Sequence, residues 1–256
     1  MQNKRKILFW CLVLLAVLCA VIVVKTKNSD NDRGKVYEEM QEDNKVSEEA
    51  DIEEEDTEEE IVEIPIDFAG LQQKNKDIYA WIRIPGAKVD YPIVQHEEDD
   101  AYYLNHTVEG RKGLPGSIYT ETLNRKNFSD RNTVIYGHNM KNGTMFGSLK
   151  KFRDASFFEK NRHIIIYMEN RILKYEIFAA CTWDNKHILA SRNFDTPQNR
   201  TTYIEQIFAV RDMNSQIKKD IEVTADDRII TLSTCMNNKA KRFIVSGVLI
   251  YDSQNP

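Results

Sequence analysis

The longest apolar segment of the chain lies near its start, at residues 7–24, where 18 successive residues carry no charge. A helix rises about 1.5 Å per residue, so this segment would span about 27 Å, close to the hydrocarbon core of a bilayer. Lys4, Arg5 and Lys6 precede it, and positive charge tends to remain cytoplasmic. We therefore predict a cytoplasmic basic end at residues 1–6, a single transmembrane helix at residues 7–24 and an extracytoplasmic remainder.

A cleaved signal peptide and a lipoprotein signal are alternative interpretations of residues 7–24. No pair of small residues with the spacing of a cleavage site closes the segment, and Cys19 follows Ala-Val-Leu rather than a small residue. An uncleaved anchor in the cell membrane is therefore the favoured interpretation.

The segment that follows, residues 25–64, is polar and acidic. Within it, residues 36–63 hold fifteen Asp and Glu against one Lys. Such a segment has too few apolar residues to join a core, and its charges repel one another. We predict a disordered acidic linker that holds the following domain, residues 65–256, away from an anionic surface.

From residue 65 onward, short runs of β-branched and aromatic residues are separated mostly by turns rich in glycine, proline or asparagine. The runs predict eight strands, at residues 80–84, 89–94, 117–119, 133–136, 163–167, 172–183, 228–233 and 243–251. Helical periodicity appears at residues 67–79, 145–152 and 200–217. Without a regular strand–helix alternation, this pattern is typical of a mainly β domain, either a barrel or a sandwich.

Composition narrows the class of protein further. A chain of 256 residues with 41% hydrophobic residues suffices for one core with appendages, so we predict one globular domain. The net charge of −5 comes from the linker, and by difference residues 64–256 carry about +4. No basic helix, aromatic–basic interleaving or zinc-finger spacing accompanies this charge, so we predict no nucleic-acid partner.

The four cysteines differ in their surroundings. Cys11 and Cys19 lie in the apolar segment, and Cys181 lies in a run typical of a buried strand, where we predict a core thiol. Cys235 instead ends the strand-forming run that starts at Ile229. A disulfide between Cys181 and Cys235 is the alternative in an oxidising compartment.

Two more reactive side chains border strand-forming runs. His138 follows the run that starts at Asn132, and Arg242 opens the run after Cys235. A thiol, an imidazole and a guanidinium supply a nucleophile, a proton donor and a fixed positive charge for an oxyanion, which acyl transfer requires. The alternatives are a buried thiol for Cys235 and a solvated charge for Arg242, with Lys239 and Lys241 as rival cations. The other histidines, His96, His106, His163 and His187, are expected to be surface or capping residues. The five histidines lack the close spacing of a metal site, and no metal is predicted.

Four motifs occur in order along the chain: Tyr136-Gly-His-Asn, Thr144-Met-Phe, Thr231-Leu-Ser-Thr-Cys and Arg242-Phe-Ile-Val. Together they resemble the sortase family of cysteine transpeptidases over about residues 65–252. The helix-forming insert at residues 200–217 makes the chain most similar to class B sortases. This resemblance implies a closed eight-stranded β-barrel with peripheral helices, which the strand pattern alone does not distinguish from a sandwich.

The resemblance also implies roles for individual residues. Cys235 would be the nucleophile, His138 the general acid and then base, and Arg242 the partner of the oxyanion. Ser233 and Leu104 resemble substrate-contacting positions of class B sortases, although plain packing is an alternative for both. Met236 stands where some relatives carry an acidic residue, so no contact that depends on that charge is expected.

The function implied is that of a membrane-anchored cysteine transpeptidase of a Gram-positive cell. It would cleave an Asn-Pro-Xaa-Thr-Asn-like sorting motif of secreted proteins after the threonine, through a thioacyl intermediate, and transfer them to an amine of cell wall peptidoglycan. The chemistry requires no cofactor, and the sequence leaves calcium dependence open. The alternatives are a pilin-polymerising sortase, whose acceptor is a lysine of another subunit, and a non-catalytic stalked surface binding module.

Overall fold

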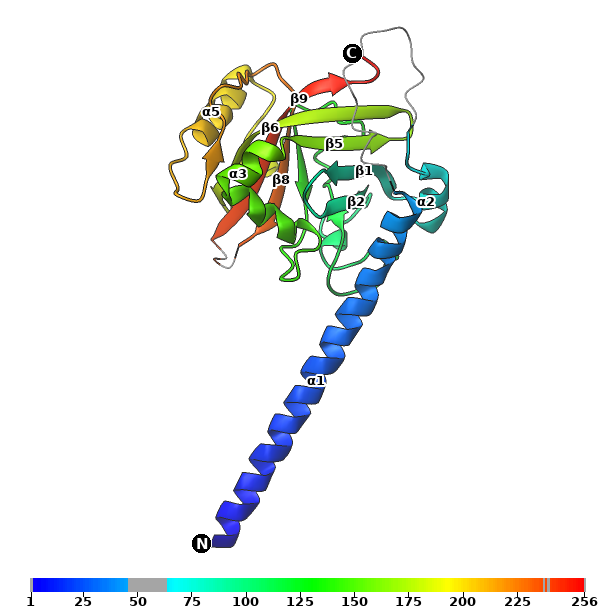
Figure 1. Ribbon diagram of the computed structural model, residues 1–256, viewed down its shortest axis with the longest axis vertical. Helices are drawn as coiled ribbons and strands as arrows, with labels where there is room; N and C mark the ends of the chain where they lie inside the picture. Colours follow the sequence, from blue (N-terminus) through cyan, green and yellow to red (C-terminus); the bar gives the residue numbers. More distant parts are fainter. Residues whose placement is uncertain (1, 46–63, 237, 239, 256) are drawn as a thin grey trace.

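The computed structural model describes residues 2–45, 64–236, 238 and 240–255. A long helix, α1 (Gln2–Asp43), projects from one side of a rounded β-barrel, and shorter helices lie around the outside of the barrel (Figure 1).

Eight strands close the barrel in the order β5-β1-β2-β3-β4-β8-β9-β6, because β5 pairs with both β1 and β6. Their bounds are β1 (Ile78–Ile84), β2 (Val89–Val94), β3 (Ile118–Tyr119), β4 (Asn132–Tyr136), β5 (His163–Met168), β6 (Arg171–Asp184), β8 (Ile229–Cys235) and β9 (Lys241–Asp252). The β2–β3 and β4–β8 pairs are parallel and the remaining pairs antiparallel. The predicted closed eight-stranded barrel is confirmed, and each predicted strand overlaps an observed one.

The helices connect the strands on the outside of the barrel. Besides α1 they are α2 (Phe68–Lys74), the 3₁₀ helices η2 (Tyr102–Leu104) and η3 (Phe146–Arg153), α3 (Ala155–Lys160), α4 (Ile188–Ser191) and α5 (Pro197–Phe208). The last two lie in the insert between β6 and β8. Together with the confirmed barrel, they match the predicted architecture of a barrel with peripheral helices.

The helix predicted over residues 200–217 is wrong in its second half. The observed α5 begins earlier, with Thr196 as N-cap and Pro197 in the first turn, and ends at Phe208. Beyond it Asp212 accepts a hydrogen bond from Thr182 Oγ1 at 2.6 Å, and a short strand, β7 (Gln216–Ile217), pairs with the outer edge of β6. Asp and Asn favour turns, and here they redirect the chain back to the sheet.

Two apolar clusters stabilise the domain. The larger fills the barrel, and the smaller lies between the barrel wall and the insert, where Phe178, Trp183 and Tyr203 meet. Cys181 belongs to the smaller cluster and is fully buried, and burial raises the pKa of its thiol to about 12. Cys181 is thus a core thiol, and both it and Cys235 are free rather than disulfide-bonded.

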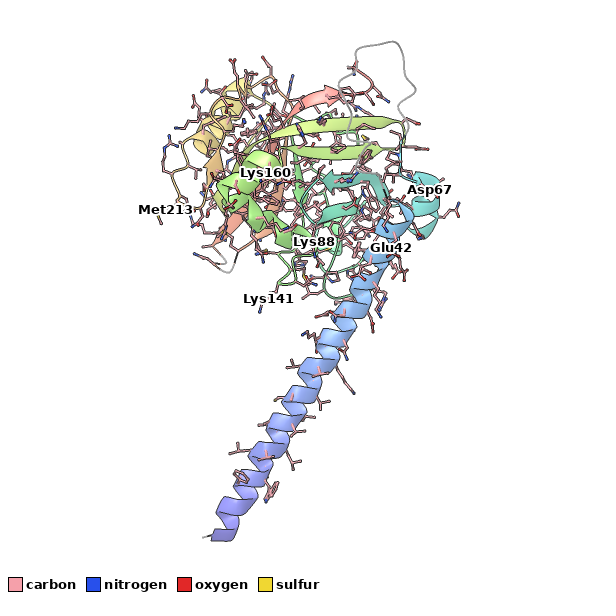
Figure 2. The ribbon with its side chains drawn as sticks, in the orientation of Figure 1. Glu42, Asp67, Lys88, Lys141, Lys160 and Met213 are labelled. Atoms are coloured by element: carbon pink, nitrogen blue, oxygen red, sulfur yellow. The ribbon has the colours of Figure 1, made fainter. Side chains whose placement is uncertain are left out.

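The predicted disordered linker over residues 25–64 is wrong for its first part. Helix α1 continues without a break to Asp43, and Val36, Tyr37 and Met40 are buried against the barrel at 7%, 3% and 0% exposure. Figure 2 shows the last turns of α1, where Glu42 is labelled, against the domain near Asp67. Residues 46–63 of the predicted linker lie outside the described residues.

The reason for this difference is the spacing of the apolar residues. Three apolar residues at positions 36, 37 and 40 form a stripe on one face of the helix, while Glu38, Glu39 and Glu42 lie on the exposed face. A count of charges over the whole segment hides this stripe.

The first part of α1 is a candidate membrane span. Within Phe9–Asp43 an 18-residue window has a mean hydropathy of 2.6, and none of it is buried in the structure. Length and composition agree with the predicted transmembrane helix at residues 7–24, and a signal sequence passes the same test.

Candidate functional site

Cys235 and Arg242 lie opposite each other at the end of one antiparallel strand pair. Cys235 is the last residue of β8 and Arg242 the second residue of β9, and the register of the two strands pairs them directly. The Nη1 atom of Arg242 contacts the Sγ atom of Cys235. The sheet register itself therefore places a permanent positive charge beside the thiol.

His138 reaches the same place through a parallel strand pair. In the β4–β8 register Tyr136 lies opposite Ser233. Because the two strands are parallel, two residues further along each of them bring His138 level with Cys235. The backbone beyond the strands stays attached: Gly137 N donates to Ser233 O at 3.3 Å, and Thr234 Oγ1 donates to Gly137 O at 2.7 Å. Asn139 Nδ2 donates to the carbonyl oxygen of Cys235 at 2.9 Å.

Gly137 is required by a close approach on this path. A Cβ atom at this position would lie 2.5 Å from Cδ1 of Ile118 and 2.8 Å from Cδ2 of Phe146. Distances this short do not occur between real side chains, so the residue before His138 has to be glycine for the strand to pass between these two side chains.

The imidazole of His138 is oriented by a backbone carbonyl. Its Nε2 atom lies 2.7 Å from the carbonyl oxygen of Leu104, which ends η2. A carbonyl oxygen only accepts hydrogen bonds, so Nε2 carries the proton of this contact. In the neutral ring Nδ1 is then the nitrogen able to accept a proton.

All five predicted site residues, Cys235, His138, Arg242, Ser233 and Leu104, line one cleft of about 420 Å³. The structure thus brings together every candidate that the sequence singled out. Ser233 is buried at 4% exposure, and Leu104 is half-buried.

Four further residues of the cleft were missed by sequence reasoning: Tyr119, Tyr136, Glu121 and His187. The rings of Tyr119 and Tyr136 stack with centroids 5.5 Å apart, and burial raises the pKa of both phenols, which therefore stay neutral. Tyr136 precedes Gly137-His138 directly, and this adjacency was the available signal for it. No local signal marks the other three.

Glu121 and His187 pair across one wall of the cleft. His187 Nε2 lies 2.5 Å from Glu121 Oε2, while Nδ1 of the same ring accepts a hydrogen bond from Ala190 N at 3.0 Å and so caps α4. Of the two roles expected for His187, surface or capping residue, the structure shows the cap. Burial raises the pKa of the Glu121 carboxyl, an effect that the nearby His187 partly opposes.

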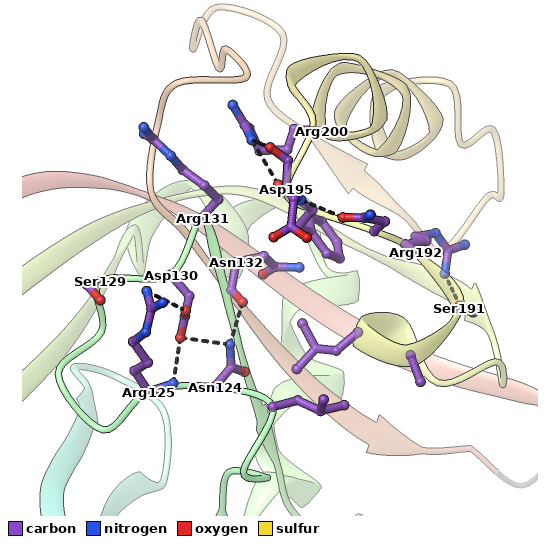
Figure 3. Close-up of a pocket in the computed structure, with 15 residues that line it drawn as sticks. Asn124, Arg125, Ser129, Asp130, Arg131, Asn132, Ser191, Arg192, Asp195 and Arg200 are labelled. Carbon is purple, nitrogen blue, oxygen red and sulfur yellow. Dashed lines mark hydrogen bonds and ion pairs between the residues drawn. The ribbon is translucent and has the colours of Figure 1, made fainter.

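A larger cavity of about 920 Å³ lies on the other side of α4 and is lined by Arg125, Arg131, Arg192 and Arg200 (Figure 3). Every one of these guanidiniums is engaged. Arg200 donates to the carbonyl oxygens of Ala225, Phe194 and Asp195, and Arg131 to that of Asp226.

The other two arginines of this cavity interact with side chains. Arg192 stacks over the ring of Trp183 at 5.2 Å, and Arg125 pairs with Asp130 at 3.6 Å. The residues that line this cavity include neither cysteine nor histidine. The smaller cleft is therefore the candidate active site.

Within the described residues, no group of three or more His, Cys, Asp or Glu side chains is arranged to hold a metal ion. The arrangement that is present, a thiol with a guanidinium and an imidazole, is suited to acyl transfer.

Comparisons with known proteins agree with this chemistry. A family model described as "Sortase domain" matches residues 82–250. Sortase B of Listeria monocytogenes is 34% identical over 193 residues, which cover 73% of this chain and 76% of that protein. Sortase B of Staphylococcus aureus is 32% identical over 188 residues, covering 72% and 74%.

Solved structures give the same result. A crystal structure of sortase B from Bacillus anthracis in complex with AAEK1 has a TM-score of 0.69 at 33% identity and covers 86% of this chain and 97% of that one. A Staphylococcus aureus sortase B–substrate complex has a TM-score of 0.62 at 29% identity and covers 72% of this chain and 84% of that one.

Proposed function

Since this chain belongs to the sortase family and is a cysteine transpeptidase of the cell wall anchoring kind, we propose that Cys235, His138 and Arg242 carry its chemistry. The observation that carries the proposal is that these three side chains, from three neighbouring strands or their ends, meet in one cleft. Strand β8 delivers the thiol, its antiparallel neighbour β9 the guanidinium, and its parallel neighbour β4 leads into the imidazole.

In the first half-reaction, the Cys235 thiolate attacks the carbonyl carbon of the scissile peptide bond. Arg242 donates to the oxygen as it gains negative charge, a task suited to a planar donor that is always charged. His138, which enters this step as the imidazolium partner of the thiolate, gives its Nδ1 proton to the leaving amine, and the C–N bond breaks to leave a thioacyl enzyme and a neutral imidazole.

In the second half-reaction, an incoming amine attacks the thioester carbonyl. His138 now accepts the proton that the amine loses, the C–S bond breaks and the thiolate leaves. One imidazole thus serves as acid and then as base, and the product carries a new amide bond.

We further propose that the substrate is the Asn-Pro-Xaa-Thr-Asn-like sorting motif of a secreted protein, cleaved after its threonine. The lining of the cleft supports this: the stacked Tyr119 and Tyr136 offer apolar surface, and Ser233 and Leu104 line the same cleft as the thiol. The proposed acceptor is an amine of cell wall peptidoglycan.

The proposed location is the cell membrane, crossed once by residues 7–24 with the amino end cytoplasmic. Support comes from the apolar first part of α1 and from the basic residues before it. The proposed catalytic domain, residues 65–256, then lies outside together with the docked last turns of α1.

The test uses the full-length chain in detergent micelles with quenched fluorescent peptides of different sorting motifs. Each is incubated with and without a short peptidoglycan-type peptide amine, and products are identified by mass. Cleavage after threonine, with an amide product only when amine is present, is the expected result. Failure to process any peptide, or preference for a lysine side chain of a folded subunit as acceptor, would contradict the proposal.

A further inference from the structure

The docked end of α1 contacts the loop that supports the catalytic cleft. This loop, residues 105–117, links η2 to β3 and is called here the η2–β3 loop. The hydroxyl of Tyr37 lies 2.6 Å from Gly116 O and 2.9 Å from Ser117 Oγ, and it accepts a hydrogen bond from Val108 N at 3.0 Å. One buried hydroxyl therefore ties the beginning and the end of the loop together.

Arg33, one helical turn before Tyr37, holds the same loop at a second point. Its Nε atom donates to Leu114 O at 2.9 Å. Its guanidinium also packs on Gly113, where a Cβ atom would lie 2.7 Å from Cζ of Arg33. Residues four apart lie on one face of a helix, so both contacts come from the same side of α1.

The opposite side of this loop touches the catalytic histidine. Gly116 adopts a φ of +66°, and a Cβ atom there would lie 2.6 Å from Leu104 O and 3.1 Å from Cδ2 of His138. Leu104 O is the acceptor that orients the His138 ring. Gly116 therefore contacts Tyr37 on one side and the histidine with its acceptor on the other.

A second path leads from Tyr37 to the segment after the histidine. The ring of Tyr37 packs edge-on against Tyr91 with centroids 5.7 Å apart, and the Tyr91 hydroxyl accepts from Met145 N at 2.9 Å. The next residue, Phe146, donates its N–H to His138 O at 3.0 Å. Tyr37 thus supports the backbone on both sides of the imidazole.

We propose that Tyr37 and Arg33 are positioning residues for His138, so that the contacts of these two side chains of the anchor helix with the η2–β3 loop set the geometry of the active site. The inference rests on the proposed role of His138. Its physical basis is the steep dependence of acyl transfer on position, since a displacement of about 1 Å can cost about 10²-fold in rate.

The test compares Tyr37→Phe with Asn44→Ala in the full-length chain in detergent micelles. Tyr37→Phe removes only the hydroxyl, whereas Asn44 accepts a hydrogen bond from Asp67 N at 2.9 Å and so holds α1 to the segment before α2. We expect Tyr37→Phe to lower kcat by about 10- to 10²-fold with KM little changed. Asn44→Ala should keep the wild-type kcat even where it lowers the melting temperature.

The pH profile separates positioning from stability. A displaced imidazole transfers protons less efficiently, so the kcat/KM profile of Tyr37→Phe should be lowered across the whole pH range, whereas a loss of stability alone would leave it unchanged wherever the variant is folded. Arg33→Met should show a smaller change in the same direction, and Arg33→Lys, which retains a donor toward Leu114 O, should recover part of it.

A readout without peptide uses the rate of Cys235 alkylation by iodoacetamide against pH, followed by mass mapping of that cysteine. We expect Cys235 of Tyr37→Phe to be alkylated at a rate different from that of the wild type, because the displaced imidazole leaves the thiol in different surroundings. Wild-type values of both kcat and alkylation in Tyr37→Phe, or an equal loss of kcat in Asn44→Ala, would overturn the inference. If the wild type cleaves no peptide, the proposed function fails, and the alkylation profile still decides the inference.

Discussion

The two cavities on either side of α4 show why a collection of charged residues is not an active site. The arginine-rich cavity in Figure 3 is larger, at about 920 Å³ against 420 Å³, and holds four guanidiniums. Those groups interact with backbone carbonyls, a carboxylate and an aromatic ring. Arg200, for example, donates to three carbonyl oxygens. In the cleft, the single guanidinium of Arg242 contacts the thiol.

This difference implies different consequences of mutation. An arginine that satisfies buried carbonyls contributes to the free energy of unfolding, whereas one aimed at a reacting group contributes to the rate. The four experiments below test this distinction, in order of decreasing expected effect.

The largest effect is expected for Cys235→Ala, which removes the nucleophile from the cleft. Peptide cleavage should fall by at least about 10⁴-fold, because the remaining groups have no atom to attack the carbonyl. The melting temperature should stay close to that of the wild type. The matched control is Cys181→Ala in the core, which should keep its turnover and lose about 1 kcal/mol of stability. Turnover that persists in Cys235→Ala would remove the central assignment.

Arg242→Lys should lower kcat/KM by about 10²–10³-fold, since lysine retains the charge but not the rigid, planar donor. Lys241→Ala, one residue earlier on β9, is the control and should leave the rate unchanged. Rates on one peptide, with a melting curve for each variant, decide the matter. The assignment is wrong if Lys241→Ala is the impaired enzyme and Arg242→Lys the active one.

In the larger cavity, Arg200→Met should lower stability and leave the rate unchanged. Three backbone carbonyls lose their donor, so the free energy of unfolding should fall by about 1.5–3 kcal/mol, with kcat unchanged at temperatures where the variant is folded. Arg242→Met should do the opposite: lost activity with stability within about 0.5 kcal/mol of the wild type. Urea unfolding and peptide kinetics on both variants test this. A kinetic defect in Arg200→Met would contradict the distinction between a structural arginine in the larger cavity and a reactive one in the cleft.

The smallest effect concerns Glu121, which lines the cleft. Burial raises the pKa of its carboxyl above the value of 4.5 for an unperturbed glutamate. The fold then favours the protonated form, so Glu121 contributes stability below about pH 4.5 that is lost as the pH rises through the raised pKa. Glu121→Gln should flatten this decline in a series of melting temperatures from pH 4 to 7, and an unchanged slope would contradict the interpretation.

Much of the barrel was predictable because strands are local features. β-branched runs between turn residues marked all eight barrel strands, and the ordered motifs around His138, Cys235 and Arg242 marked the site. The strand β7 and the end of α5 were not predictable in this way, since Gln216 and Ile217 become a strand only because the edge of β6 is available to pair with them.

The docking of α1 is a second feature that the local sequence pattern did not predict. Composition favoured a disordered segment, and three buried side chains among many acidic ones were enough to make its first part a packed helix. Local charge density predicts solvation, but it does not reveal which face of a helix meets a complementary surface.

The sequence by itself determined the reactive groups, the strands that end beside them and the apolar segment near the start of the chain. Only the tertiary structure decided that His138 stands level with Cys235, because that depends on the parallel register of two strands about a hundred residues apart in the sequence. It likewise decided that Leu104 orients the imidazole, that Glu121 meets His187 and that Tyr37 supports the loop behind the histidine. Such contacts join segments far apart in the chain, and their partners are chosen by packing rather than by any local pattern.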